Sequence, residues 1–225
     1  MSSVSIWIIM IAVMVLSLIV QNMLQSRFKK YSEVPMGLTG AEVASGMLAA
    51  HGIRDVSIVS IQGKLTDHYD PTTRTVNLSE DVYFGRSVAA AAVAAHECGH
   101  VVQHATGYVF LKMRSAMVPV VTFSNNIVSW VLLAGVLLIN IFPSLLWIGI
   151  ALFAITTLFS FITLPVEINA SARAVKWLET SGLVSYETKP MAVDALKWAA
   201  YTYVIAALGS LATLLYYISL GNRRS

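Results

Sequence analysis

The chain has 225 residues, of which 56% are hydrophobic and only 12% are charged, against about 25% charged in ordinary soluble domains. This deficit of charge indicates a membrane protein and argues against a soluble globular domain. The formal net charge of +3 is modest, and membrane orientation explains it better than nucleic-acid binding does. The single cysteine, Cys98, excludes an internal disulfide and a cysteine-rich zinc motif, so we expect its thiol to pack in the interior.

Residues 1–24 contain the first apolar run, which is long enough to span a bilayer. No basic residue precedes this run and no cleavage site of small residues is evident after it, so we expect a retained anchor rather than a signal peptide. The basic residues Arg27, Lys29 and Lys30 follow at once. By the positive-inside rule, they place this end of the anchor in the cytoplasm.

Residues 25–117 have the composition of a small extramembrane subdomain. Thr39 and Glu42 form the capping-box pattern of a helix start. The β-branched residues 56–61 predict a strand, and residues 64–79 predict a hairpin. An edge strand of this hairpin could align an extended peptide by main-chain hydrogen bonds. The alternative is a surface hairpin that only covers the neighbouring helix.

The stretch from Ser87 to His104 contains one glycine and no proline, and its alanine-rich first half predicts a helix. His96 and His100 are four residues apart, so they share a helix face and can bind one metal ion with the spacing of a zinc site. Glu97 is placed to take a proton from the catalytic water, which is the general-base role in a metalloprotease. The alternative is a pair of buried histidines that are satisfied by hydrogen bonds without a metal.

Residues 118–166 contain two further apolar stretches that are joined by a short connection without charge. Each stretch is long enough to span a bilayer, and together they predict a helical hairpin. Asn125 and Asn126 lie in the first stretch and are costly in hydrocarbon. We therefore expect them to face another helix.

Residues 167–197 are a polar helical segment that we expect to complete the extramembrane unit, and residues 198–225 comprise a last apolar run and a tail with Arg223 and Arg224. The loop at residues 25–117 holds nine lysines and arginines, the segment at residues 167–197 holds four and the tail holds two. With the long loop inside, thirteen of these are cytoplasmic. This favours four spans with both ends outside, and a last segment that re-enters without crossing is the alternative.

A catalytic zinc typically takes three protein ligands and leaves one position for water. A third histidine in the pattern His-x-x-Gly-x-x-His is excluded, because Gln103 and Thr106 occupy those positions. A glutamate from a later helix is the other common solution. Glu167 is the best candidate, because the membrane hairpin returns the chain to the face from which it left; the alternative is an ordinary acid at a membrane boundary. Weaker competitors are Glu80, Asp81 and Glu179.

Four segments carry a family resemblance that covers nearly the whole chain: His96–His100, Leu65–Asp70, Leu78–Glu80 and Glu167–Ala174. With the membrane hairpin, they resemble the bacterial neutral zinc metallopeptidases of the YugP type. More distantly, the order of elements is similar to HtpX-like and CAAX-prenyl membrane proteases.

The resemblance implies that His96, His100 and Glu167 bind one Zn²⁺ per chain and that Glu97 is the base. We therefore expect a mainly α-helical, polytopic membrane protein with about four transmembrane helices. A small α/β subdomain of the zincin (gluzincin) type is expected at the membrane face.

One residue departs from the pattern of the more distant relatives, which carry an aspartate four residues after the glutamate ligand. Here that position is Ser171. Ligating histidines need a hydrogen-bond partner on their second nitrogen to fix the tautomer. Ser171 and Asn169 are candidate substitutes for the aspartate.

The leading hypothesis is an integral-membrane zinc endopeptidase of the bacterial cell membrane, with its active site on the cytoplasmic side. Its expected partners are the lipid bilayer and a peptide or membrane-protein substrate, and no nucleic acid. Candidates for stabilising the oxyanion are Arg173, His104 and Tyr108, although His104 could instead bond a carbonyl at the helix end. The alternatives are a non-enzymatic scaffold with a structural metal, which needs a closed four-ligand site, and an ion transporter.

Overall fold

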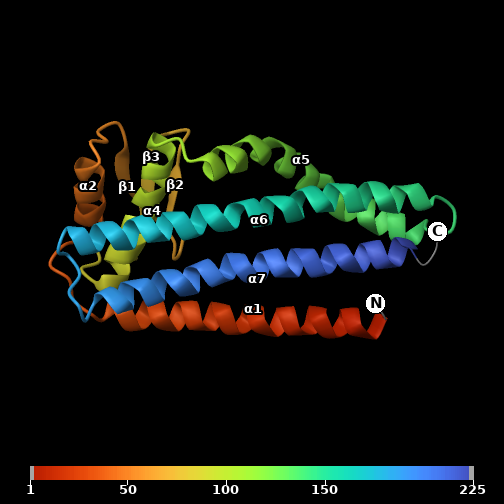
Figure 1. Cartoon of the computed structure of the whole chain (residues 1–225), viewed down its shortest axis with the longest axis horizontal. Coiled ribbons are helices and arrows are strands. Elements are labelled where there is room, and N and C mark those ends of the chain that lie inside the picture. The colour runs from red at the N-terminus through yellow and green to blue at the C-terminus, as the bar shows by residue number, and fades with distance from the viewer. Residues whose placement is uncertain (1–2, 223–225) are drawn as a thin grey trace. The chain divides into compact units, whose positions relative to one another are not determined.

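The computed structural model describes residues 3–222 and is mainly helical in that range (Figure 1). Four of its helices are long and apolar enough to cross a membrane, as the sequence predicts. They are α1 (Ser3–Ser32), α5 (Val109–Leu137), α6 (Pro143–Thr180) and α7 (Lys189–Asn222). The length of α7 is that of a spanning helix rather than a short re-entrant segment. The tail with Arg223 and Arg224 lies outside the described residues.

Helix α6 joins two segments that the sequence predicts one after the other. The sequence predicts an apolar span that is followed at once by a polar helical segment, and the structure has one continuous helix from Pro143 to Thr180, with Pro165 inside it. No glycine or proline occurs between Glu167 and Ser181, so nothing interrupts the helix there. Gly182 then adopts a φ of 72° just beyond the helix end, a conformation that suits glycine.

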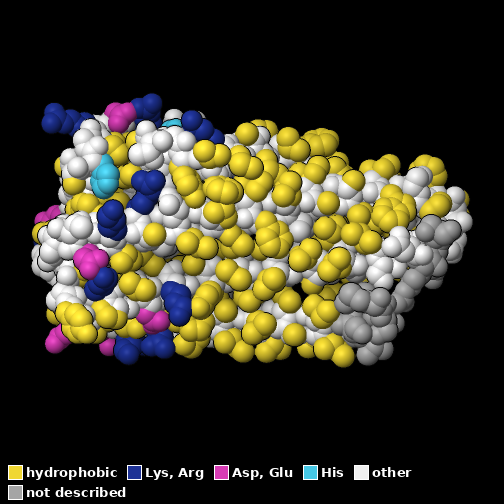
Figure 2. Space-filling view, in the orientation of Figure 1, with side chains coloured by type: hydrophobic (Ala, Val, Ile, Leu, Met, Phe, Trp, Pro, Cys, Tyr) yellow, Lys and Arg dark blue, Asp and Glu magenta, His cyan; other side chains and the backbone are white. Residues whose placement is uncertain are grey.

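The chain divides into two compact units. The first comprises Met1–Ile19, Met113–Leu164 and Thr202–Ser225. Within residues 3–222, Arg114 is the only charged residue that belongs to it. On the face that Figure 2 shows, apolar side chains accordingly predominate over the first unit, and charged side chains gather over the second.

The interior of the first unit is built from close helix contacts. Gly135 lies so near the backbone of Leu146 that a Cβ would come within 2.7 Å of it, and Thr157 and Ser210 share a hydrogen bond of 2.7 Å.

The expectation that Asn125 and Asn126 face another helix is wrong, because both are exposed. They lie off the buried stripe of α5, which consists of Val121, Ser124, Val128, Leu132 and Gly135.

The second unit comprises Val20–Lys112 and Pro165–Tyr201. Its sheet has the order β1 (Ser57–Ile61), β3 (Thr75–Ser79), β2 (His68–Asp70), in which β3 is central, β1 is parallel to it and β2 is antiparallel to it. The predicted hairpin is thus confirmed, and β2 is an edge strand. Besides the ends of the long helices, this unit contains α2 (Gly40–Ala50), β1 (Ser57–Ile61), β2 (His68–Asp70), β3 (Thr75–Ser79), α3 (Glu80–Tyr83) and α4 (Val88–Ala105).

Local sequence signals account for much of this unit. Thr39 and Glu42 form the predicted capping box at the start of α2, with both reciprocal hydrogen bonds. Asp67 accepts hydrogen bonds from the backbone and hydroxyl of Ser79, which ties the segment before β2 to the end of β3. Helix α4 runs through the core, and most of its residues are buried. The sheet and α2 thus pack against the helix that carries the histidine pair.

Candidate metal centre

Helix α4 presents His96 and His100 on one face. The side chain of Ser87 caps its first turn by accepting a hydrogen bond from the backbone of Ala90 at 3.2 Å. The alanine-rich sequence then continues as an uninterrupted helix to Ala105. The two imidazole rings lie 4.8 Å apart between centroids and meet edge to face.

A close crossing of α4 and α6 brings the third residue to this pair. A Cβ on Gly99 would lie 2.5 Å from the carbonyl oxygen of Ala170, so only glycine allows the two backbones to approach this closely. Ala170 and Ala174 are fully buried on α6. Glu167 lies three residues before Ala170 and hence on the same side of α6. The crossing therefore places its carboxylate over the histidines.

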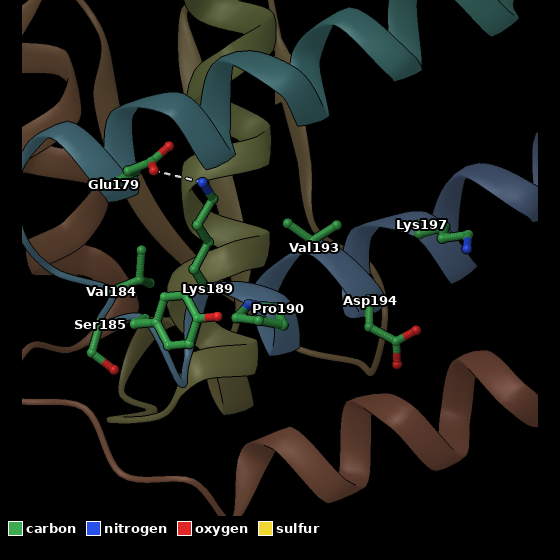
Figure 3. A pocket seen from close by; sticks show the side chains of 9 residues that line it. Glu179, Val184, Ser185, Lys189, Pro190, Val193, Asp194 and Lys197 are labelled. Carbon is green, nitrogen blue, oxygen red and sulfur yellow. Dashed lines mark hydrogen bonds and ion pairs between the residues drawn. The ribbon is translucent and has the colours of Figure 1, made fainter.

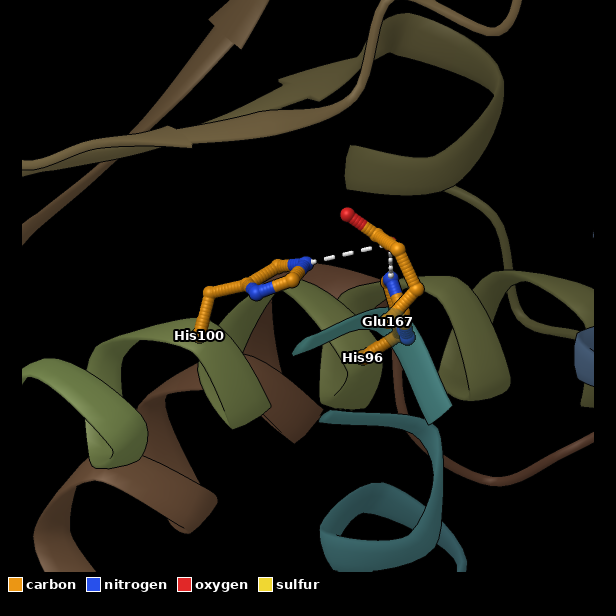
Figure 4. A group of neighbouring side chains, drawn as sticks. All are labelled: His96, His100 and Glu167. Carbon is orange, nitrogen blue, oxygen red and sulfur yellow. Dashed lines mark ion pairs between the residues drawn. The ribbon is translucent and has the colours of Figure 1, made fainter. Parts of the chain in front are cut away.

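The three side chains converge on one point (Figure 4). Glu167 Oε2 lies 3.3 Å from His96 Nε2 and 3.5 Å from His100 Nε2. Two ligand atoms on a tetrahedral zinc with bonds of about 2.0–2.2 Å would be about 3.4 Å apart. The donor set of two imidazole nitrogens and one carboxylate oxygen, all within 4.8 Å of one another, therefore fits zinc and leaves a fourth position for water.

The site is shielded from solvent. Glu167 is 3% exposed, Glu97 and His100 are 7% exposed, and His96 is half-buried. Burial alone would lower the pKa of His100, but the hydrogen bond that its ring donates to Glu167 and the charges of Glu97 and Glu167 raise that pKa above its ordinary value. In the metal-free protein, Glu167 and the His100 ring thus stabilise each other's charged forms.

Each histidine has a partner on its other ring nitrogen. His96 Nδ1 lies 3.0 Å from the hydroxyl of Ser171, which is one of the two substitutes considered for the missing aspartate. His100 Nδ1 lies 3.1 Å from Oε1 of Gln103. The other substitute, Asn169, accepts hydrogen bonds from Gln103 and Arg173. Sequence reasoning missed Gln103, although its position three residues after His100 places it on the same helix face.

The three oxyanion candidates lie near α4 and α6. Arg173 Nε donates to Asn169 Oδ1 at 2.8 Å, and the hydroxyl of Tyr108 donates to the carbonyl of Pro165 at 3.4 Å. His104 Nδ1 lies 2.9 Å from the hydroxyl of Tyr69 on the edge strand β2. Their role toward an oxyanion stays a prediction.

The other residues that the sequence raised as ligands lie apart from the histidine pair. Glu80 and Asp81 are exposed in the first turn of α3, and Glu179 forms an ion pair with Lys189. Cys98 is fully buried with its Sγ 3.6 Å from the carbonyl of Ala44, and burial raises the pKa of its thiol. Its expected packing role is therefore confirmed.

The second unit also has an open groove of about 770 Å³ (Figure 3). Its two acids are engaged, Glu179 with Lys189 and Asp194 with Arg27 and Tyr31. With neither histidine nor cysteine in its lining, it does not have the chemistry of a zinc site. It is lined by Glu179, Val184, Ser185, Tyr186, Lys189, Pro190, Val193, Asp194 and Lys197.

Comparison with known proteins now adds to this geometry. Residues 6–222 match the model of the family described as "Putative neutral zinc metallopeptidase", and the chain belongs to that family. It is 43% identical over 210 residues to the "Putative membrane protease YugP" of Bacillus subtilis (strain 168), with 92% of each chain covered. The resemblance that the sequence motifs carry is thus confirmed. No solved structure matches the chain significantly.

Proposed function

We propose that the chain is an integral-membrane zinc metalloendopeptidase of the gluzincin type. The observation that carries the proposal is the position of Glu167, whose carboxylate lies within 3.5 Å of Nε2 of both histidines although it is far from them in sequence. Family membership and the similarity to a membrane protease support the same activity. The ligands would be His96, His100 and Glu167, with one Zn²⁺ per chain.

When bound, zinc supplies a Lewis acid that polarises the scissile carbonyl and acidifies the catalytic water. Glu97 takes a proton from that water as it attacks the carbonyl carbon. The same carboxyl then delivers the proton to the leaving amine as the C–N bond breaks. Its burial beside the ligand His96 in α4 supports this role, because the carboxylate is held by a rigid helix in a site of low polarity. Arg173, His104 and Tyr108 stay the candidates for stabilising the oxyanion.

The substrate would bind as an extended peptide along β2. This strand is at the edge of the sheet, and its Tyr69 lies within 2.9 Å of His104 on α4, the helix that carries the histidine pair. Pairing at the free edge would hold the scissile bond by main-chain hydrogen bonds. The competing interpretation, in which the hairpin only covers α4, predicts that changes on β2 leave the KM for peptides unaltered.

Residues 25–117 and 167–197 would form the catalytic part of the protein, on the cytoplasmic side of a bacterial cell membrane. The thirteen basic residues of these two segments support this orientation. Membrane and membrane-associated proteins would then be the substrates. Labelling Thr72→Cys with a membrane-impermeant maleimide tests the orientation, because Thr72 is exposed and the native Cys98 is buried. We expect labelling only after permeabilisation, whereas labelling of intact cells would reverse the orientation.

Removal and return of the metal tests the activity. Detergent-purified protein should hydrolyse casein, lose this activity when zinc is chelated and regain it when one equivalent of zinc is restored. Hydrolysis that survives complete removal of zinc would refute the proposal. Tightly bound zinc without hydrolysis of casein or of membrane-protein substrates would favour the structural-metal alternative.

A further inference from the structure

Gln103 is a fully buried amide that uses both ends of its side chain. Its Oε1 lies 3.1 Å from Nδ1 of His100. Its Nε2 donates to the backbone carbonyl of Val166 at 2.7 Å and to Oδ1 of Asn169 at 3.0 Å. A single side chain therefore joins one histidine of α4 to the segment of α6 that carries Glu167.

Two independent contacts fix which way this amide points. A backbone carbonyl can only accept a hydrogen bond, so the Gln103 atom next to Val166 must be the amide nitrogen. The guanidinium of Arg173 can only donate, so the Asn169 atom that it meets at 2.8 Å must be the oxygen. That oxygen in turn requires the nitrogen of Gln103 opposite it. Both contacts leave Oε1 of Gln103 facing His100.

The orientation of the Gln103 amide determines which ring nitrogen of His100 carries a proton. Because Oε1 has no hydrogen to give, Nδ1 of His100 must carry the proton of this hydrogen bond. Nε2, the atom that lies 3.5 Å from Glu167, is then the nitrogen that can bind a metal; without a metal, the charged ring can donate from Nε2 to the Glu167 carboxylate. Ser171 cannot fix His96 in the same way, because a hydroxyl both donates and accepts.

We propose that Gln103 is the positioning residue of the metal centre: it holds His100 as the Nδ1–H tautomer with Nε2 directed at the metal. Through Val166 it also ties this ligand to the residue before Glu167. The inference rests on the proposed function only in that His100 is taken to be a zinc ligand. Arg173 fixes the orientation of the Asn169 amide, and Asn169 in turn restricts the Gln103 amide to one orientation.

The test combines ring nitrogen NMR with zinc affinity. Metal-free, full-length Glu167→Ala protein with ¹⁵N-labelled histidine is examined at alkaline pH, where the ring is neutral, and His100→Gln assigns the signal. Glu167 is removed because its carboxylate would otherwise compete with Gln103 by accepting a proton from Nε2 of His100. We expect a protonated Nδ1 and an unprotonated Nε2 in this background, and a mixture of tautomers when Gln103→Met is added to it. Zinc affinity from chelator competition should fall about tenfold to a hundredfold in Gln103→Met.

The matched control is Cys98→Ala, which removes a fully buried side chain of the same helix without touching this network. It should keep the Nδ1–H tautomer in the Glu167→Ala background, and on its own it should bind zinc close to the wild-type affinity. An Nε2–H tautomer in Glu167→Ala would overturn the proposal even if Gln103→Met does not fold. An unchanged zinc affinity in a folded Gln103→Met would overturn it as well.

Failure of this inference and failure of the proposed function give different results. If the wild type binds zinc but hydrolyses nothing, and Glu167→Ala shows the Nδ1–H tautomer, the proposed function would be overturned and the role of Gln103 would stand. Zinc-dependent hydrolysis with equal zinc affinity in wild type and Gln103→Met would overturn the role of Gln103 and leave the proposed function intact.

Discussion

Substitution of Gly99 by alanine should dismantle the metal centre without touching a ligand. The new Cβ would lie 2.5 Å from the carbonyl oxygen of Ala170 and 3.0 Å from its carbonyl carbon and Cα. An ordinary contact begins at 3.4 Å, so the two helices must separate by about 0.9 Å at this point. Zinc sites tolerate errors in bond length of about 0.2 Å. Glu167 would therefore be carried out of bonding distance of the zinc that the histidines hold.

Metal analysis and calorimetric zinc titration of purified Gly99→Ala measure this effect, and casein hydrolysis should be lost with the zinc. Forced separation in a packed interior should also cost about 1–3 kcal/mol of unfolding free energy. The matched control is Gly46→Ala in α2, where the new Cβ would meet only the ring of Trp177 at 3.5 Å. The control should bind zinc normally and be more stable by up to about 1 kcal/mol. Wild-type zinc binding by Gly99→Ala would refute the role of the helix crossing.

Three further outcomes are expected. Glu167→Ala should lower zinc occupancy in metal analysis while the four long helices persist by circular dichroism, and full occupancy would remove Glu167 from the ligand set. Zinc affinity should fall as the pH is lowered through the raised pKa of His100, because only the deprotonated ring binds metal. The fall should be up to about tenfold per pH unit for each proton displaced. A zinc affinity that does not change with pH in a titration series would contradict this prediction. Thr39→Ala should cost about 0.5–2 kcal/mol in chemical denaturation through loss of the α2 cap, and an unchanged midpoint would show that the cap is dispensable.

Local signals in the sequence were sufficient for the long helices and for the histidine pair on α4. Alanine content and the i, i+4 spacing predict α4 with its histidine pair, and the capping box predicts the start of α2. The apolar runs predict the four long helices. Such features depend on neighbouring residues alone, so no knowledge of tertiary packing is needed.

The rest depends on contacts between segments that are distant in sequence. The parallel pairing of β1 with β3 has no local signature, and the unbroken course of α6 is obscured where apolar residues give way to polar ones. Asn125 and Asn126 miss the buried stripe of α5 because the rotation of a helix is set by its packing partners. The importance of Gln103 emerges only once α6 supplies the acceptors for its amide.

The most direct test of the central claim is a side-by-side measurement of zinc content and casein hydrolysis for the detergent-purified wild type and Glu97→Gln. Glu97 is not a ligand in this account, so both proteins should hold one zinc per chain. Hydrolysis by the variant should fall by at least about 10²-fold to 10⁴-fold, because the amide cannot accept the proton of the water. Normal turnover by Glu97→Gln, or absence of zinc from the wild type, would contradict the assignment of this site as a zinc peptidase centre.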